Sequence, residues 1–152
     1  MDTRANLSKQ HPRAYQTLLD MNKAAAEAAS ASGIDPRLVE LIKIRASQIN
    51  NCAYCLRMHT RDALRLGEQA ERLAILSAWR ESSGYFSAVE RASLALAEAV
   101  VRIDDGGLDD GLYARVAEFL TPSQIAAVSW VANAIGVFNR VAIASRYPVE
   151  PS

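Results

Sequence analysis

Residues 40–59 read ELIKIRASQINNCAYCLRMH, in which two helix-forming segments are separated by a pair of asparagines. Apolar residues at helical spacing precede the break. Asn50 and Asn51 interrupt this segment because asparagine competes for backbone hydrogen bonds and prefers helix caps. A second helix opens at Cys52 and is ended by Gly67. The stretch therefore predicts two consecutive helices joined by a short turn.

Helical periodicity, with residues that start and stop helices, continues on both sides of this pair. Pro12 suits the first turn of a helix that Gly33 stops, and Asp35 followed by Pro36 signals the start of the next. Further helices are expected over residues 69–81, 87–103, 110–119 and 121–145, with a loop at 104–107. Capping boxes mark two of these starts, at Ser87 with Glu90 and at Thr121 with Gln124.

Alternating β-branched runs, internal linkers and repeats are absent from the sequence. We therefore expect an all-α chain that forms one domain over residues 1–152, with its core at about 35–145. Residues 1–10 and 146–152 are expected to be tails, because Pro148 and Pro151 cannot extend the last helix.

The composition excludes several classes of protein. Of the 152 residues, 50% are hydrophobic and 22% are charged, which excludes a disordered tail or a collagen-like repeat. Seventeen Lys plus Arg balance seventeen Asp plus Glu, so charge gives no reason to expect a nucleic-acid partner. We expect no membrane partner, because the longest apolar stretch is shorter than the ~20 residues that span a bilayer. The first residues, MDTRANLSKQHPR, lack a signal-peptide core, so a cytoplasmic location is expected.

The strongest candidates for catalytic residues in the sequence are Cys52, Cys55 and His59. Positions three and four apart share a helix face, so both sulfurs and the imidazole should lie along one stripe. The positive end of the helix dipole favours thiolate over thiol there. A thiol beside a histidine is a nucleophile with a nearby proton carrier, and a second thiol can convert a sulfenic acid into a disulfide. An antiparallel helix pair could return the Glu40 carboxylate to this stripe.

Two other interpretations of these residues stay open at this point. The cysteines could simply be core residues, because cysteine is among the most buried residue types. Cys52, Cys55, His59 and Glu40 could instead bind zinc, although structural zinc sites usually take ligands from two separated pairs. A thioredoxin-like site is excluded because no βαβ pattern is present.

The spacing of these four residues resembles a known family. The signature resembles that of the AhpD-like alkylhydroperoxidases, in the carboxymuconolactone decarboxylase superfamily. It consists of Glu40, eleven residues, Cys52, two residues, Cys55, three residues and His59. The similarity extends over about residues 35–145 and includes Asn139 followed by Arg140.

This resemblance implies a multihelical AhpD-like fold and a thiol-dependent peroxidase or disulfide oxidoreductase. It implies that Cys55 attacks the peroxide, that Cys52 resolves the sulfenic acid, and that Glu40 and His59 relay protons. An external dithiol, such as a lipoyl-bearing protein, would recycle the pair. No metal, flavin or haem cofactor is implied, and the sequence has no Gly-rich nucleotide motif.

Two features depart from this assignment. The helix dipole alone would make Cys52 the better thiolate, whereas His59 lies one turn beyond Cys55 and can take its proton directly. Some relatives have histidine between the cysteines, where this chain has Tyr54. A phenol with an ordinary pKa of ~10 is a poor base at neutral pH, so Tyr54 is expected to donate a hydrogen bond or to pack.

Two other functions compete with peroxide reduction. One is the superfamily's lactone decarboxylation, but those decarboxylases typically lack this cysteine pair. The other is a non-enzymatic redox-sensing or interaction module, in which the disulfide changes packing.

The apolar character of the last expected helix predicts that the protein is an oligomer. Residues 125–144 are apolar nearly all round, and a helix apolar on every side is buried on every side. Together with the family resemblance, this favours a homo-oligomer, either a trimer or a hexamer. The alternative is a central core helix in a monomer.

Overall fold

The computed structural model describes residues 4–152, and within that range it contains helices but no strand. The helices are α1 (Leu7–Gln10), α2 (Pro12–Ala31), α3 (Pro36–Ile49), α4 (Ala53–Arg65), α5 (Ala70–Ile75), α6 (Ala88–Val101), α7 (Asp110–Ala117) and α8 (Pro122–Ser145). Two short 3₁₀ turns, η1 (Leu76–Ala78) and η2 (Ile103–Asp105), follow α5 and α6. The all-α class expected from the sequence is confirmed.

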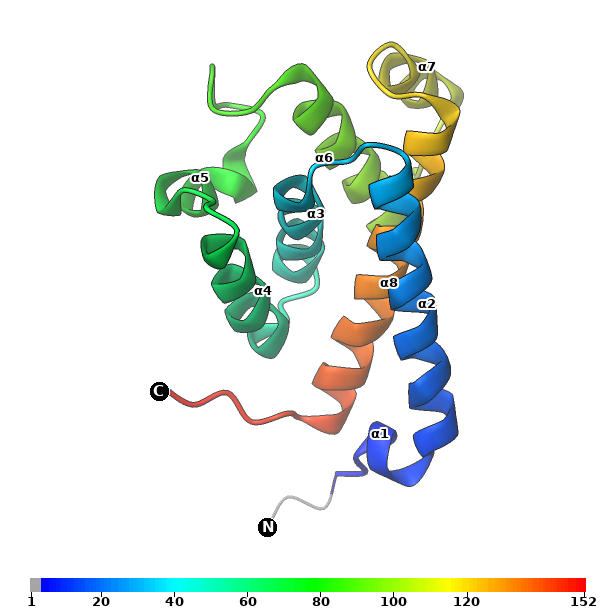
Figure 1. The fold of residues 1–152 in the computed structure, drawn as a ribbon, viewed down its shortest axis with the longest axis vertical. Coiled ribbons are helices and arrows are strands. Elements are labelled where there is room, and N and C mark those ends of the chain that lie inside the picture. The colour runs from blue at the N-terminus through cyan, green and yellow to red at the C-terminus, as the bar shows by residue number, and fades with distance from the viewer. Residues whose placement is uncertain (1–3) are drawn as a thin grey trace.

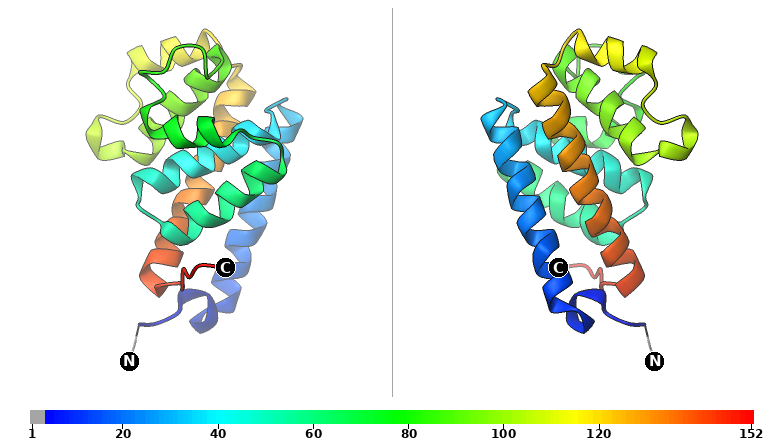
Figure 2. Two further views of the ribbon diagram at one scale, coloured as in Figure 1. Left: turned by 90° about the vertical axis from the view of Figure 1, so that its left-hand side faces the viewer. Right: turned by 90° about the vertical axis from the view of Figure 1, so that its right-hand side faces the viewer.

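Helix α8 is the centre of the fold. It packs most extensively against α2, α3 and α6, and it also contacts α1, α4 and α7. The long helices α2 and α8 lie side by side, and α1 and the segment after α8 lie at the same end of the molecule (Figures 1 and 2). Leu41 of α3, Leu94 of α6 and Val131 of α8 are almost completely buried, which places the core between these three helices.

Local capping sets most of the helix starts. The Asp35 carboxylate accepts a hydrogen bond from the Arg37 backbone N–H at 2.8 Å, so α3 begins at the predicted place. Both predicted capping boxes are present, at the start of α6 and at the start of α8. The sequence signals for these helices are therefore confirmed.

Three expected boundaries are wrong. The helix predicted over residues 69–81 ends at Ile75 and continues as η1, whose tighter winding brings Leu76 and Trp79 onto one side, where both are buried. Residues 103–105, expected to be helix end and loop, form η2.

The third boundary concerns the N-terminal tail expected over residues 1–10, of which 1–3 lie outside the described residues. Residues 7–10 form α1 because the Asn6 side chain caps it, accepting a hydrogen bond from the Lys9 N–H. Ser145 Oγ also accepts a hydrogen bond from the Leu7 N–H at 2.9 Å, which ties α1 to the end of α8.

The expectation about apolar length also needs correction. By length and composition, α8 could cross a membrane. Just over half of its most apolar window is buried within the fold, and the core helix of a protein outside the membrane passes the same test. This criterion is therefore weak evidence for a membrane segment.

A buried ionic cluster joins α3, α6 and the turn after η1. Glu98 accepts hydrogen bonds from Arg45 Nε at 2.7 Å and from Trp79 Nε1 at 2.9 Å, and it pairs with Arg80. Burial raises the pKa of the Glu98 carboxyl, but the hydrogen bonds from these three side chains outweigh burial, so the net pKa shift is downward. The carboxylate therefore remains ionised inside the protein.

Candidate functional site

The turn between α3 and α4 places the two cysteines. Asn50 caps the end of α3, and Asn51 has a φ of 55°, a left-handed conformation that asparagine tolerates better than most residues. Cys52 is the N-cap of α4, and its sulfur accepts a hydrogen bond from the Cys55 N–H at 3.3 Å. The asparagine pair therefore works as the sequence predicts, as a turn that starts a helix at the cysteines.

Cys52 and Cys55 are joined by a disulfide bond, with their Cα atoms 5.4 Å apart. Each side chain is only 1% exposed, and both pack against Ala142 of α8. Cys55 lines a pocket, whereas Cys52 does not. Of the two cysteines, Cys55 is therefore the one that borders this pocket.

Glu40 and His59 meet beside this pair. Glu40 lies on α3 and His59 on α4, and the two helices form the antiparallel pair that the short turn predicts. His59 Nδ1 lies 2.8 Å from Glu40 Oε2, and both side chains are buried. With Nδ1 held by a carboxylate, Nε2 is the nitrogen that can exchange a proton within the pocket. Lys43 Nζ, 3.6 Å from Glu40 Oε1, balances the charge of the same carboxylate.

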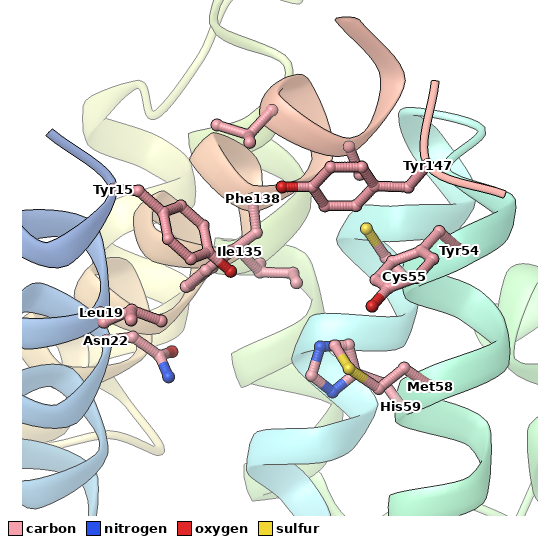
Figure 3. A pocket seen from close by; sticks show the side chains of 12 residues that line it. Tyr15, Leu19, Asn22, Tyr54, Cys55, Met58, His59, Ile135, Phe138 and Tyr147 are labelled. Atoms are coloured by element: carbon pink, nitrogen blue, oxygen red, sulfur yellow. The ribbon is translucent and has the colours of Figure 1, made fainter. Parts of the chain in front are cut away.

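The pocket that contains Cys55 has a volume of about 230 Å³ (Figure 3). Helices α2, α4 and α8 and the segment after α8 form its walls. The lining residues are Tyr15, Leu19, Asn22, Tyr54, Cys55, Met58, His59, Ile135, Phe138, Val141, Ala142 and Tyr147. The surface is mostly apolar, and none of these residues is Lys, Arg, Asp or Glu.

Part of this pocket lies far from the cysteines in the chain and was not predicted from the sequence. Tyr15, Leu19 and Asn22 come from α2, and Tyr147 comes from a segment expected to be a tail. The 15–19–22 spacing shows that these three side chains share a helix face. No local signal shows which helix that face meets.

Tyr54, which lies between the two cysteines in the sequence, packs in the structure. Its ring meets the Tyr147 ring edge to face, with the centroids 5.1 Å apart, and the Arg57 guanidinium lies 5.9 Å from its centre. Arg57 also donates a hydrogen bond to the Glu150 backbone carbonyl at 2.6 Å. Tyr54 thus helps hold the C-terminal segment against α4.

Asn139 of α8 connects the central helix to the cysteine-bearing turn. Its amide nitrogen donates a hydrogen bond to Ser47 Oγ, and its amide oxygen accepts one from Asn50, both at 3.0 Å. The Ser47 carbonyl in turn accepts a hydrogen bond from the Cys52 N–H at 3.0 Å. This fully buried amide therefore fixes both sides of the turn.

The zinc site considered from the sequence does not form around the cysteines. Both sulfurs are used in the disulfide, and the cluster with metal-ligand spacing consists of Glu40, His59 and Asp62. Lys43 pairs with Glu40, and Arg65 pairs with Asp62 at 3.0 Å. The two carboxylates of this cluster are therefore already paired with cationic side chains, which makes the cluster a poor fit for a metal ion.

Comparison with known proteins agrees with the fold and the motif. Residues 12–99 match the model of the carboxymuconolactone decarboxylase family. The uncharacterised protein YdfG of Bacillus subtilis (strain 168) is 36% identical over 144 residues, which cover 95% of each chain. A solved structure from Agrobacterium tumefaciens, of a protein of unknown function described as a candidate antioxidant defence protein AhpD, is 32% identical with a TM-score of 0.84. That match covers 98% of this chain and 100% of the other.

The chain belongs to the carboxymuconolactone decarboxylase family. Within that family it is an AhpD-like member, as the cysteine motif and the Agrobacterium structure indicate. The debrominase Bmp8 shares the fold at a TM-score of 0.69, with 88% of this chain and 76% of that chain covered. At 20% identity, this second likeness concerns the fold alone.

Proposed function

We propose that the protein is a thiol-dependent peroxidase that reduces hydrogen peroxide or organic peroxides. One observation carries the proposal: a disulfide-bonded cysteine pair lies beside a buried histidine–glutamate pair, and Cys55 and His59 both line one pocket. A nucleophilic sulfur, a proton carrier and a space for the substrate are therefore in one place.

In the first step, the Cys55 thiolate attacks one peroxide oxygen and the O–O bond breaks. The other oxygen leaves as an alcohol or water after taking a proton, which His59 supplies with Glu40 holding its ring. Cys55 is then a sulfenic acid. The Cys52 thiolate attacks this sulfur, hydroxide leaves and is protonated to water, and the disulfide forms.

An external dithiol, such as a lipoyl-bearing protein, completes the cycle. Its thiolate attacks Cys55, because that sulfur faces the pocket, and Cys52 leaves as a thiolate. At the N-cap of α4, Cys52 accepts the hydrogen bond of the Cys55 N–H, which stabilises a leaving thiolate. The helix-end effect that favours a Cys52 thiolate therefore suits its role as leaving group, and Cys55 keeps the nucleophilic role.

The pocket gives less support to the alternative function, lactone decarboxylation. Lactone decarboxylation acts on a carboxylate-bearing substrate, and the pocket lining includes no Lys or Arg to hold a carboxylate. Cys55, which lines this pocket and is bonded to Cys52, would also have no role in that reaction.

Peroxide consumption in the presence of dithiothreitol tests the proposal. We expect the wild type to consume hydrogen peroxide and cumene hydroperoxide catalytically and Cys55→Ser to consume neither. Cys52→Ser should turn over without forming the Cys52–Cys55 disulfide, because dithiothreitol must then reduce the Cys55 sulfenic acid directly. Consumption no faster than with dithiothreitol alone would contradict peroxidase activity. If a disulfide still formed in that case, a redox-sensing module would be favoured instead.

We also propose that the protein assembles as a trimer or a hexamer. Trp130, Val137 and Ile143 of the central helix remain 53%, 40% and 44% exposed in one chain. Exposed apolar side chains on a core helix favour a subunit contact.

Light scattering at micromolar concentration should give a mass three or six times the 16.5 kDa of one chain. Trp130→Asp should lower this mass by placing a charge in the contact, whereas Glu81→Gln, on an exposed loop, should not. A wild-type mass near that of one chain would contradict the assembly.

A further inference from the structure

The two facing walls of the Cys55 pocket differ in chemistry. One wall carries Cys55 and His59 of α4. The facing wall is α2, with Tyr15 and Asn22 on either side of Leu19 (Figure 3). These residues lie four and three positions apart, so they share one face of the helix. The proposed reaction uses only the α4 wall.

Two polar groups on the α2 wall are available to a ligand. The Tyr15 hydroxyl and the Asn22 amide point into the pocket, toward the side that holds Cys55 and His59 (Figure 3). Within residues 4–152, neither group makes a hydrogen bond to another side chain or to the backbone. By contrast, the nearby Tyr147 hydroxyl pairs with Ser8 Oγ at 2.7 Å.

The Tyr15 hydroxyl stays protonated at neutral pH. Burial raises its pKa above the ordinary value of 10.0, and the neighbouring phenols of Tyr147 and Tyr54 raise it further. Tyr15 is therefore a neutral hydrogen-bond donor. Asn22 offers both a donor and an acceptor on one side chain.

The rest of the pocket restricts the kind of ligand that these groups can meet. The lining contains no permanently charged side chain, and His59 directs its Nδ1 to Glu40. A volume of about 230 Å³ is below the range of ~300–1,000 Å³ typical of pockets for drug-sized ligands. Mostly apolar walls of this size suit a small, uncharged molecule with an aromatic or branched body.

We propose that Tyr15 and Asn22 form a hydrogen-bonding subsite for a neutral carbonyl or carboxamide group at the far end of a small aromatic ligand. The reactive end of the ligand faces Cys55. Asn22 pairs with both the oxygen and the N–H of the amide, and Tyr15 donates to the oxygen. This inference rests on the proposed function for one point only, which is that the reactive end of the ligand is a hydroperoxide.

Binding to the disulfide form tests the subsite without any turnover. The probes are cumyl alcohol, which is the reduction product of cumene hydroperoxide, and its para-carboxamide derivative. Isothermal titration calorimetry should show the carboxamide binding wild type about tenfold more tightly, as expected for one or two additional net hydrogen bonds.

Two variants remove the polar atoms with little change in volume. Asn22→Leu and Tyr15→Phe should each reduce the preference for the carboxamide while leaving the affinity for cumyl alcohol unchanged. Gln16→Leu is the matched control, because Gln16 lies on the exposed side of α2 and bonds to Asp20. It should keep the full preference.

Equal affinity of wild type for both alcohols, or no binding of either, would overturn the subsite. A preference that persists in both Asn22→Leu and Tyr15→Phe would overturn it as well. If the protein consumes no peroxide but shows the preference, the proposed function fails and the subsite stands. If it consumes peroxide without the preference, only the subsite fails.

Discussion

We expect His59→Gln to slow oxidation of the reduced protein by hydrogen peroxide about 10²–10⁴-fold, the usual cost of removing a positioned acid–base group. Glu40→Gln should also slow it, because the His59 ring then loses the carboxylate that lies 2.8 Å from its Nδ1. Stopped-flow measurement of thiol loss, from pH 5 to 10, gives both rates. The pH of half-maximal reactivity should move upward in His59→Gln, since no neighbouring imidazole then accepts the thiol proton.

Asp62→Asn is the matched control for the relay. Asp62 lies 4.0 Å from His59 Nδ1 but pairs with Arg65 and does not line the pocket. Its removal should leave the oxidation rate close to wild type, and all variants should keep their helical circular dichroism. Wild-type rates in both His59→Gln and Glu40→Gln would contradict the relay and favour a simple Cys-x-x-Cys oxidoreductase.

Glu98→Gln should give the largest loss of stability among single substitutions outside the site. The change leaves Arg45, which is also buried, without its charge partner. Breaking a buried ion pair by removing one partner costs about 3–5 kcal/mol. Urea unfolding at pH 7 should show this as a lower free energy of unfolding. Glu81→Gln, which changes an exposed glutamate, should leave that free energy nearly unchanged.

The pH dependence of this loss follows from the lowered pKa of Glu98. The ordinary glutamate value is 4.5, and the folded-state value lies below it. The ionised carboxylate therefore contributes its full stability above pH 4.5, and this contribution is lost as pH falls through the folded-state pKa. The stability gap between wild type and Glu98→Gln should narrow below pH 4.5. A gap of constant size down to pH 3 would contradict this account of the cluster.

Local signals explain why much of the fold can be predicted from the sequence. Asp35, Ser87 and Thr121 cap their helices through residues two or three positions away, so each start depends on a few neighbouring residues. Glu40 and His59 are predictable for a related reason. They lie on consecutive helices joined by a short turn, which leaves an antiparallel pairing as the simplest arrangement.

Long-range contacts account for what the sequence analysis missed. Tyr15 and Tyr147 line the pocket with Cys55 although they come from opposite ends of the chain. Their placement depends on how α2 and α8 pack, which no local pattern specifies. Arg45 and Glu98 are also 53 positions apart. A charged residue within an apolar helix is a signal of such a cluster, but it does not identify the partner.

One measurement tests the peroxidase mechanism most directly. Reduced protein receives one equivalent of hydrogen peroxide, and its peptides are analysed by mass spectrometry with a sulfenic-acid label. The mechanism predicts a single Cys52–Cys55 bridged peptide in wild type and a labelled Cys55 in Cys52→Ser. A label on Cys52 in Cys55→Ser, with no label on Cys55 in Cys52→Ser, would contradict it.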